Sequence, residues 1–463
     1  MSRLKNNRKL FIYKGLRFYV FSPKLVLRQN TDMKILKSSR ISPFGGLNFV
    51  LQEFENKQIG QLLQDHLPKL PAQCKYSWKD LLYSFWSIYF CGGDCVEDIS
   101  INLKEHLKTN PFFNIPSPDR ILDRFKELSL PKDLFTLPRG TSLHQFSLHP
   151  FLNELNLKLL CSLNFNKDAL HTLDYDNTLI FNNKSDSLST YKRAYGYCPG
   201  VGIIGNQVVY IENRNGNSAA KDLQFETLTR MFRELEKQQI KINSFRADGA
   251  SYQFNIVDLI SQRVNKFFIR AVMSSALAQQ ISTIQDWEAV VLGNETAYRG
   301  EITYIPFTNI ALKKKQKHKL KEYRLVVTKI KRRDHQINAF TNEAYNYSAV
   351  LTNDWKKTKN QVAEFYNQRG AIEKEFDVLK NDFGWNHLPF SKLEQNTVFL
   401  IFTAICRNLY YYIITEFSKK VKHLKSNFRI KKFIFRFITI PAKWIKSARQ
   451  QKLRVYGNLH FKT

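Results

Sequence analysis

The sequence is poor in acidic residues. Its 463 positions hold 40 Asp and Glu against 71 Lys and Arg, which gives a formal net charge of +31. An excess this large repels itself in a compact chain and favours a polyanionic partner. Nucleic acid fits best, because neutralising phosphates releases counterions and drives association. A membrane surface or a ribosomal location would also suit the charge, so composition indicates a class of partner and no chemistry.

The sequence also lacks long apolar runs and a secretion signal. No stretch of about 18 apolar residues occurs, so no membrane-spanning segment is expected. The first residues, MSRLKNNRKLFIYKGLRFYVF, are basic and aromatic but have no clean apolar core and no small-residue cleavage site. We expect residues 1–32 to be an upstream extension, with Met33 as an alternative start. The expected location is the cytoplasm, in association with the nucleoid.

Cysteine is scarce, with six residues in the whole chain. Cys91 and Cys95 lack a second pair or nearby histidines at zinc-site spacing, so buried free thiols are expected in place of a zinc knuckle. Hydrophobic residues are abundant at 43%, as in a folded globular protein. A chain of this length can form two or three domains.

Residues 33–160 are expected to form a helical domain. Apolar residues recur at three- and four-residue spacing in LNFVLQEFENKQIGQLLQDHL and in WKDLLYSFWSIYF. Helices of this kind can dock on DNA, or they can serve packing and dimerisation. Both roles remain open at this point.

Residues 165–416 mix strands and helices. HTLDYDNTLIF is typical of a strand, and GVGIIGNQVVYIEN of two strands joined by a turn at Gly205–Asn206. An amphipathic helix, the strand INSFRAD, a helix near 251–262 and the strand KFFIRAVM follow. This order predicts an α/β fold with a ribonuclease-H-like core, a mixed sheet with helices on its faces.

Two further segments stand apart in composition. Residues 275–350 hold short β-like runs around the basic stretch KKKQKHKLKEYR, which predicts a β-strand insertion with a loop that is solvated or lies against DNA. Helical character returns over 361–382 and 394–416. Residues 417–463 contain 14 Lys or Arg and no acid, a basic tail suited to a nucleic-acid backbone.

Two aspartates stand at the ends of predicted strands. Asp176 closes the first strand and Asp248 the fourth, and these strands are neighbours in a ribonuclease-H-like sheet. Their carboxylates would therefore share one site, although a lone Asp at a strand end more often caps a turn. Carboxylates hold hard ions such as Mg²⁺, and paired metal ions suit phosphodiester chemistry. Asp174 lies on the same side of the strand as Asp176 and is its rival.

A third carboxylate comes from YNQRGAIEKEFDVLK. Tyr366, Arg369, Glu373 and Lys380 would fall within roughly 60° of arc on one α-helix. Such a stripe can present one metal ligand, Glu373, beside three phosphate contacts, because Arg offers a fork and Lys a point charge. The alternative is an amphipathic helix with a charged solvent face.

The spacing Tyr-x2-Arg-x3-Glu-x6-Lys resembles the YREK signature of DDE transposases in the insertion-sequence-4 superfamily. LDYDNT and FRADGASY resemble the first-Asp and second-Asp segments of that superfamily. YKRAYGYCPGV, ENRNGN and FGWNHLP look most like the 1380 family of insertion sequences. The resemblance covers about 33–416, and the long interval before Glu373 fits the β-strand insertion of these enzymes.

This resemblance implies that Asp176, Asp248 and Glu373 bind two Mg²⁺ or Mn²⁺ ions, while Tyr366, Arg369 and Lys380 hold phosphates. It implies cut-and-paste transposition by a homodimer that acts on double-stranded DNA, at terminal inverted repeats and target DNA. Trp287 is a candidate for stacking on a flipped base, although a core tryptophan is the commoner case. The alternative functions are a metal-dependent nuclease and a domesticated, DNA-binding derivative.

Overall fold

The computed structural model describes residues 9–13, 16–20, 41–111, 114–137, 140–333, 336–337 and 343–457. The chain forms two compact units, residues 1–41 and residues 42–463. In the first unit, β1 (Lys9–Tyr13) and β2 (Leu16–Val20) pair antiparallel. Apart from these strands, the extension expected over residues 1–32 and its alternative start at Met33 lie outside the described residues.

Helices α1 to α6 open the second unit, where the spacing of apolar residues predicts helices. Helix α3 begins at a capping box, in which the Ser77 side chain accepts from the Asp80 N–H and the Asp80 carboxylate accepts from the Ser77 N–H. A π-helical turn at Ile99–Leu103 precedes α4. The bounds are α1 (Gly45–Asn56), α2 (Ile59–His66), α3 (Trp78–Phe90), α4 (Lys104–Leu107), α5 (Pro118–Leu128) and α6 (Pro150–Ser162).

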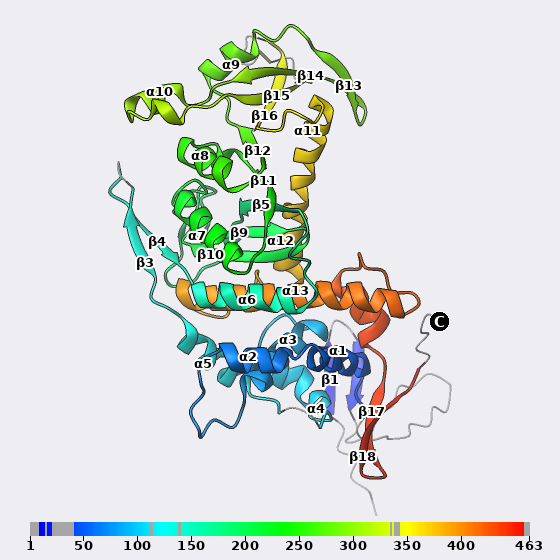
Figure 1. Cartoon of the computed structure of the whole chain (residues 1–463). Coiled ribbons are helices and arrows are strands. Elements are labelled where there is room, and N and C mark those ends of the chain that lie inside the picture. The colour runs from blue at the N-terminus through cyan, green and yellow to red at the C-terminus, as the bar shows by residue number, and fades with distance from the viewer. Residues whose placement is uncertain are drawn as a thin grey trace, which may run out of the picture. The chain divides into compact units, whose positions relative to one another are not determined.

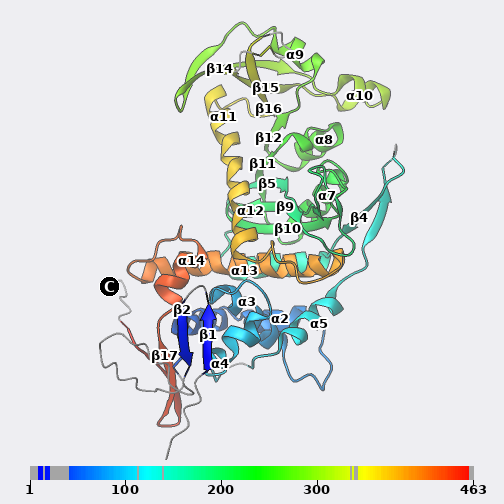
Figure 2. The ribbon, with the colours of Figure 1, turned by 180° about the vertical axis from the view of Figure 1, so that it is seen from behind.

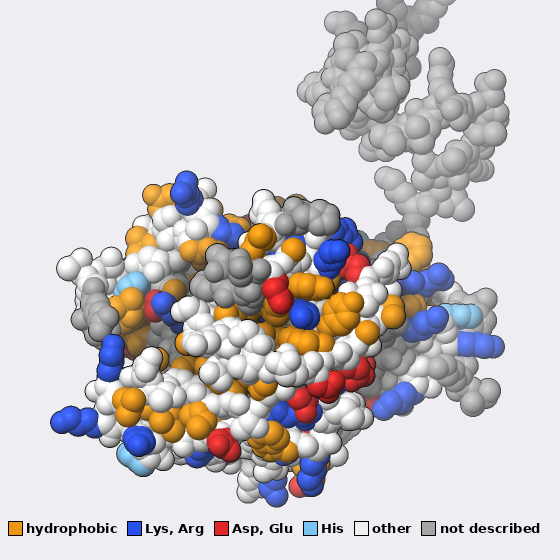
Figure 3. Space-filling view, turned by 90° about the horizontal axis from the view of Figure 1, so that it is seen from above, with side chains coloured by type: hydrophobic (Ala, Val, Ile, Leu, Met, Phe, Trp, Pro, Cys, Tyr) orange, Lys and Arg blue, Asp and Glu red, His pale blue; other side chains and the backbone are white. Residues whose placement is uncertain are grey.

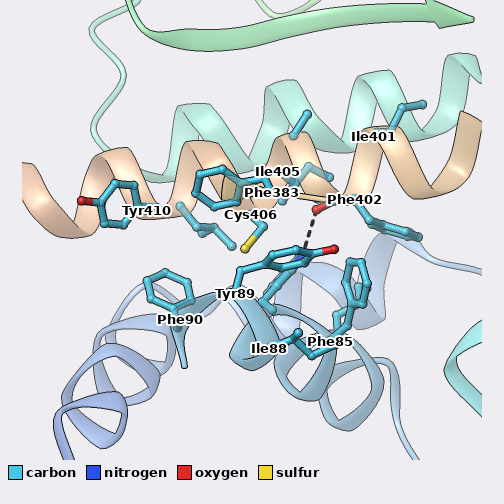
Figure 4. Close-up of a cluster of buried hydrophobic side chains, with 14 of the residues drawn as sticks. Phe85, Ile88, Tyr89, Phe90, Phe383, Ile401, Phe402, Ile405, Cys406 and Tyr410 are labelled. Atoms are coloured by element: carbon cyan, nitrogen blue, oxygen red, sulfur yellow. Dashed lines mark hydrogen bonds between the residues drawn. The ribbon is translucent and has the colours of Figure 1, made fainter. Parts of the chain in front are cut away.

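Helix α13 (Leu393–Lys420) lies between the large sheet and helices α1 to α3 (Figure 1). Aromatic side chains of α3 pack against it in the core cluster, and the Trp86 indole N–H donates to the Phe402 carbonyl at 3.1 Å (Figure 4). By length and composition α13 could cross a membrane, contrary to the expectation from the sequence. However, 94% of its most apolar window is buried inside the protein, so packing in the core accounts for its apolar character.

The large sheet is mixed and has eleven strands in the described part of the chain. Its order is β13-β14-β15-β16-β12-β11-β5-β9-β10-β4-β3, and only β11 pairs in parallel, with β5 and with β12. The bounds are β3 (Asp133–Thr136), β4 (Leu143–Ser147), β5 (His171–Asn177), β9 (Gly200–Ile204), β10 (Gln207–Arg214), β11 (Ile242–Ala247), β12 (Lys266–Ala271), β13 (Glu288–Leu292), β14 (Glu295–Tyr304), β15 (Tyr323–Lys331) and β16 (Tyr345–Thr352). The protein is thus an α/β protein built on a large mixed sheet.

The centre of this sheet follows the element order predicted from the sequence. Strands β5, β9 and β10 are followed by α7 (Gln224–Lys237), β11, α8 (Phe254–Arg263) and β12. Gly205 has φ +61° in the turn between β9 and β10, a conformation that glycine adopts at little cost. Side chains of α7 and α8 pack on one sheet face, while α13 and the N-terminal helices share a core with β9 and β10. Both faces of the central strands are therefore covered.

Strands β3 and β4 lie within the segment for which a helical domain is expected, and they extend the sheet beyond β10. At the opposite edge, β13 to β16 from the expected insertion continue the same sheet through the pairing of β16 with β12. That segment also contains α9 (Ser275–Ile281), α10 (Thr308–Lys313) and a 3-10 turn at Lys317–Lys319. Seen from above, basic side chains lie mostly around the edge of this end of the protein, with hydrophobic ones nearer its middle (Figure 3).

The helix expected over 361–382 is divided in two. Helix α11 (Lys359–Asn367) ends at a 3-10 turn, Gln368–Gly370, and α12 (Ala371–Asp382) follows. Three residues in a 3-10 turn rotate the chain about 60° further than in an α-helix. This rotation does not by itself turn Tyr366 away from the other three, but the four residues are shared among α11, the 3-10 turn and α12 in place of the single α-helix expected.

Short elements complete the second unit. A small sheet beside the end of β5 is formed by β6 (Ile180–Phe181), β8 (Tyr195–Tyr197) and β7 (Leu188–Ser189). The basic tail contains α14 (Ile430–Phe433), a π-helical turn at Ile434–Ile438 and the antiparallel pair β17 (Ala442–Ser447) and β18 (Gln450–Val455). Figures 1 and 2 show the β17–β18 pair projecting from the layer of helices.

Candidate active site

Strand β5 carries both rival aspartates, and the structure gives them different surroundings. Asp174 is buried at 4% exposure, and both its oxygens accept from Arg246, from Nε and Nη2, each at 2.7 Å. Burial raises the pKa of Asp174, and the Arg246 guanidinium opposes that rise. Asp176 stands one pleat further on, where the strand ends. The first carboxylate is thus engaged in a structural ion pair, and the second is the one that reaches a cavity.

Asp248 directly follows β11, the parallel neighbour of β5. The register sets Ala247 beside Tyr175, so Asp248 and Asp176 leave the sheet side by side at its carboxyl edge. One Asp248 carboxylate oxygen accepts from the Ala250 N–H at 3.0 Å, which orients the side chain at the start of a 3-10 turn.

A cavity of about 480 Å³ opens at this edge of the sheet. Asp176, Asp248 and Glu373 all line it, although they come from β5, the end of β11 and the first turn of α12. We call this cavity the carboxylate pocket. Its full lining is Asp176, Asn177, Thr178, Leu179, Phe181, Tyr191, Lys192, Cys198, Ala220, Asp248, Glu373, Phe376, Asp377 and Lys380.

Arg369 connects two of the three acids. Its Nη1 lies 2.8 Å from an Asp176 oxygen, and its Nη2 lies 3.7 Å from a Glu373 oxygen. The 3-10 turn at Gln368–Gly370 places this guanidinium just before α12, between the helix and the end of β5. The Glu373 side chain is 70% exposed, so it is free to move toward a ligand in the pocket.

The pocket disfavours one of its negative charges. Burial and the nearby charge of Asp248 raise the pKa of Asp176 to about 6, while Arg369 opposes the rise. On the far side, burial and the positive charge of Lys192 lower the pKa of Lys380. Carboxylates that share a pocket with the half-buried ammonium group of Lys380 indicate a site suited to a ligand that carries both kinds of charge, such as a metal-bound phosphate.

Of the three residues expected to contact phosphate, two lie at this site. Lys380 lines the pocket, and Arg369 contacts Asp176. Tyr366 instead packs in a small cluster with Phe268, Val326, Val350 and Val362, at 8% exposure. The centre of its ring lies 6.0 Å from the Arg369 guanidinium carbon, so its contact with the site runs through that arginine.

Comparison with known protein families gives a match that covers most of the chain. Residues 37–462 match the family described as transposase DDE domain group 1. The chain belongs to this family. No curated protein matches it. Among solved structures, a piggyBac transposase synaptic complex with hairpin DNA is similar over 84% of this chain and 78% of that one, at 10% identity and a TM-score of 0.38. A TM-score below 0.5 is too low to establish a shared fold.

Membership in a DDE transposase family gives the carboxylates of the pocket a chemical context, and their oxygens are the donors that hard divalent cations prefer. The mutual proximity of Asp176 and Asp248, which raises the pKa of Asp176, is a strain that a cation would relieve. In the described residues, no group of three Asp, Glu, His or Cys side chains is close enough to hold a metal. The three carboxylates thus have the chemistry that suits a divalent cation, and holding one would require Glu373 to approach Asp176 and Asp248.

Most of the other residues that line the pocket were not anticipated from the sequence, and three of them are suited to contact with nucleic acid. Phe181 and Tyr191, exposed by 50% and 79%, line it beside Lys192, and all three come from the small sheet and its connecting loop. Exposed aromatic rings next to a cation are suited to stacking on nucleic-acid bases. The phrase YKRAYGYCPGV marks this segment in the sequence, but no spacing within it predicts contact with Asp176.

A second cavity and the side chain of Trp287 lie apart from the carboxylate pocket. A larger cavity of about 650 Å³ lies at the opposite end of β5, near His171, but its lining contains a single carboxylate, Glu416. Trp287, a candidate for base stacking, is half-buried, and its indole N–H donates to the Ile284 carbonyl at 3.0 Å. The ammonium of Lys329 lies 4.2 Å from its ring centroid. Trp287 thus packs within the insertion and does not line the carboxylate pocket.

Proposed function

We propose that this DDE transposase catalyses cut-and-paste transposition of an insertion sequence through the carboxylate pocket. The observation that carries the proposal is the convergence of Asp176, Asp248 and Glu373, far apart in sequence, on one cavity at the carboxyl ends of two adjacent parallel strands. The substrate would be double-stranded DNA, cleaved at terminal inverted repeats and joined to target DNA. The net charge of +31 supports a DNA partner.

The proposed catalytic core is ribonuclease-H-like. Support comes from the central strand order β12-β11-β5-β9-β10, in which β11 alone is parallel to its neighbours and the first and fourth core strands lie together. Further support comes from the YREK spacing and the phrases that resemble the 1380 family within the insertion-sequence-4 superfamily. We propose residues 165–416 as this catalytic domain, with its insertion at about 275–350, preceded by a DNA-binding or dimerising segment over 33–160 and followed by the basic tail, 417–463.

Asp176, Asp248 and Glu373 would hold two divalent ions, Mg²⁺ or Mn²⁺. Bound there, the ions would activate the attacking hydroxyl and stabilise the leaving oxygen. The chain's own residues prepare this site. The Arg246–Asp174 pair fixes β5 against β11, and Arg369 neutralises Asp176 in the metal-free protein. Glu373 completes the ligand set by moving its exposed side chain.

Arg369 and Lys380 would bind phosphates of the cleaved strand. A guanidinium that leaves Asp176 can accept a phosphate in its place, because its planar fork matches both groups. Lys380 faces the same pocket from the next turns of α12 and adds a point charge. Tyr366, buried behind Arg369, would position that guanidinium and thus act on DNA indirectly. We propose a homodimer that holds one DNA end in each protomer, in the bacterial cytoplasm.

The test is strand cleavage and joining by the purified protein on DNA that carries its own element ends, with Mg²⁺. Asp176→Asn, Asp248→Asn and Glu373→Gln should each abolish both steps while DNA binding persists. Asp65→Asn, on the exposed surface of α2, is the matched control and should keep full activity. An active Asp176→Asn beside an inactive but folded Asp174→Asn would overturn the assignment within β5.

The alternative, a metal-dependent nuclease or a domesticated derivative, uses the same pocket. The same assay separates it from transposition. Cleavage without joining of the released end to target DNA would favour the nuclease, while binding without cleavage would favour the domesticated derivative.

A further inference from the structure

In the basic tail, β17 and β18 form a hairpin whose strands are joined by a two-residue turn. Ala448 and Arg449 form the turn with φ of +48° and +62°, the left-handed conformation of turns that match the twist of paired strands. The cross-strand pairs Lys443–Arg454 and Ile445–Lys452 lie on one face. Ala442–Val455, Trp444–Leu453 and Lys446–Gln451 lie on the other. The pairs Ala442–Val455 and Trp444–Leu453 thus form an apolar patch at the base of one face, while cations lie on both faces of the hairpin.

The base of this hairpin is fixed to the body of the second unit. Ala442 exchanges backbone hydrogen bonds with Ser42, at 2.8 and 2.9 Å, and the Trp444 indole N–H donates to Asn48 at 3.1 Å. A Cβ on Gly45 would lie 2.3 Å from the Ile440 carbonyl oxygen, so helix α1 meets the chain just before β17 without any gap. The apolar patch is therefore used for anchoring, and the ribbon beyond it is held in a defined direction.

The outer part of the hairpin carries cations that have no counter-ion. Among the described residues, none of Lys443, Lys446, Arg449, Lys452 and Arg454 forms an ion pair, and residues 442–455 contain no acid. Ser447, Gln450 and Gln451 surround Arg449 at the exposed tip. Amide and guanidinium groups are the side chains that bond to base edges, Gln to adenine and Arg to guanine.

We propose that the β17–β18 hairpin is a DNA-binding element that enters the major groove of a duplex with its tip. A two-stranded ribbon fits the width of that groove. The lysines and Arg454 along its sides lie where the two phosphate backbones would run, and Arg449 and Gln450 face the base edges. This proposal rests on the proposed function, because it assumes that duplex DNA is the substrate.

Ion pairs connect the segment before the hairpin to the helix that lines the carboxylate pocket. Arg429, at the start of the segment that leads to the hairpin, pairs with Asp377 at 2.7 Å and with Asp382 at 2.8 Å. Asp377 lines the carboxylate pocket. A duplex held by the hairpin is thus bound to a segment tied directly to α12, the helix that carries Glu373 and Lys380.

The first test measures the affinity of the full-length protein for a short duplex of mixed sequence over a range of salt concentrations. Lys446→Gln with Lys452→Gln should lower the slope of log affinity against log salt by about 2, since each lost phosphate contact removes about 0.9. Lys69→Gln with Lys75→Gln, which removes two exposed lysines between α2 and α3, is the matched control and should leave the slope unchanged. Equal slopes for the hairpin variant and wild type would overturn the proposal.

The second test distinguishes the groove from the backbone. On the same duplex, wild-type protein should protect guanine N7, a major-groove atom, from dimethyl sulfate, and Arg449→Ala with Gln450→Ala should lose that protection. Protection that persists in this variant would overturn entry by the hairpin tip. Tighter binding of the wild type to phosphatidylserine vesicles than to the duplex would assign the cations to a membrane instead.

Failure of this proposal is distinguishable from failure of the proposed function. If the hairpin variants bind DNA as the wild type does while Asp176→Asn abolishes cleavage, only the hairpin proposal falls. If the wild type neither binds nor cleaves DNA, the proposed function falls, and the hairpin proposal falls with it.

Discussion

The carboxylate pocket and the β17–β18 hairpin are both charged, but they handle charge in opposite ways. In the pocket, Asp176, Asp248, Glu373 and Asp377 face Lys192, Lys380 and the nearby Arg369, so the two signs nearly cancel. On the hairpin, five cations stand without an acid. Within the pocket, burial and a neighbouring charge shift the pKa of Asp176 upward and that of Lys380 downward. Charges on the hairpin are solvated and independent. Each therefore contributes little to the free energy of folding, and their contributions to DNA binding add up.

Removing a buried charge beside the pocket should have the largest effect on stability. Arg246→Met leaves the Asp174 carboxylate buried without its counter-ion and removes the bond from Arg246 to the Phe365 carbonyl. We expect the free energy of unfolding to fall by about 3 to 5 kcal/mol, as for other broken buried pairs. Urea denaturation at neutral pH measures this. If Arg246→Met lowers the free energy of unfolding by less than the substitution of an exposed residue does, the pair does not hold β5 and β11 together.

Neutralising Asp176 should act in the opposite direction. The raised pKa, about 6 against an ordinary 3.8, means that the folded protein holds this proton more tightly than the unfolded chain. Ionisation therefore costs stability as pH rises from 3.8 through 6, up to about 3 kcal/mol at 1.36 kcal/mol per pKa unit. Asp176→Asn should be more stable than metal-free wild type above pH 6, and the gap should close as pH falls toward 3.8. A difference in stability between Asp176→Asn and wild type that does not change with pH would contradict a raised pKa of Asp176.

Adding metal ions should also distinguish Asp176→Asn from wild type in a stability measurement. Mg²⁺ should raise the melting temperature of the wild type, more so above pH 6 where Asp176 is ionised, because ligand binding to the folded state stabilises it. Asp176→Asn should show a smaller shift or none, and a chelator should reverse the effect. An equal shift in both proteins would place the metal elsewhere.

Substitutions on exposed charges should change stability least. Glu373→Gln, and Lys446→Gln with Lys452→Gln, should each stay within about 0.5 kcal/mol of wild type in urea denaturation. Their functional effects should nevertheless differ, since the first removes an expected metal ligand and the second only phosphate contacts. A large loss of stability in the hairpin variant would show that its cations are structural, contrary to the contrast drawn above.

Patterns local in sequence predicted a good part of this protein. The alternation of strands and helices from β5 to β12, the turn at Gly205 and the placement of Asp176 and Asp248 at strand ends all follow from short-range periodicity and turn chemistry. The convergence of the two aspartates could be expected because neighbouring parallel strands end at one edge. The catalytic roles of these residues remain predictions, since the geometry brings them together without showing the chemistry.

Features that depend on distant partners were not predictable in the same way. The 3-10 turn at Gln368–Gly370 interrupts a stretch whose periodicity favours one helix, and its Arg369 contacts Asp176 from 193 positions away. Asp174 and Asp176 share a strand face, but Arg246 holds both oxygens of Asp174, whereas Asp176 lines the pocket. Likewise, β4 joins the sheet by pairing with β10, and β3 by pairing with β4. The hairpin of the basic tail is anchored to Ser42 and Asn48. Each of these arises from contacts that a single-sequence window does not contain.

The close approach of Gly45 and Gly46 to the tail also constrains how the chain matures. A Cβ on Gly46 would lie 2.0 Å from the Phe437 carbonyl oxygen, so the first helix of the second unit is shaped to receive a segment made almost four hundred residues later. During synthesis, the apolar faces of α1 and α3 therefore stay partly uncovered until α13 and the residues around Phe437 have left the ribosome. The N-terminal helices are consequently among the last parts of the second unit to be fully packed, after the large sheet has been synthesised.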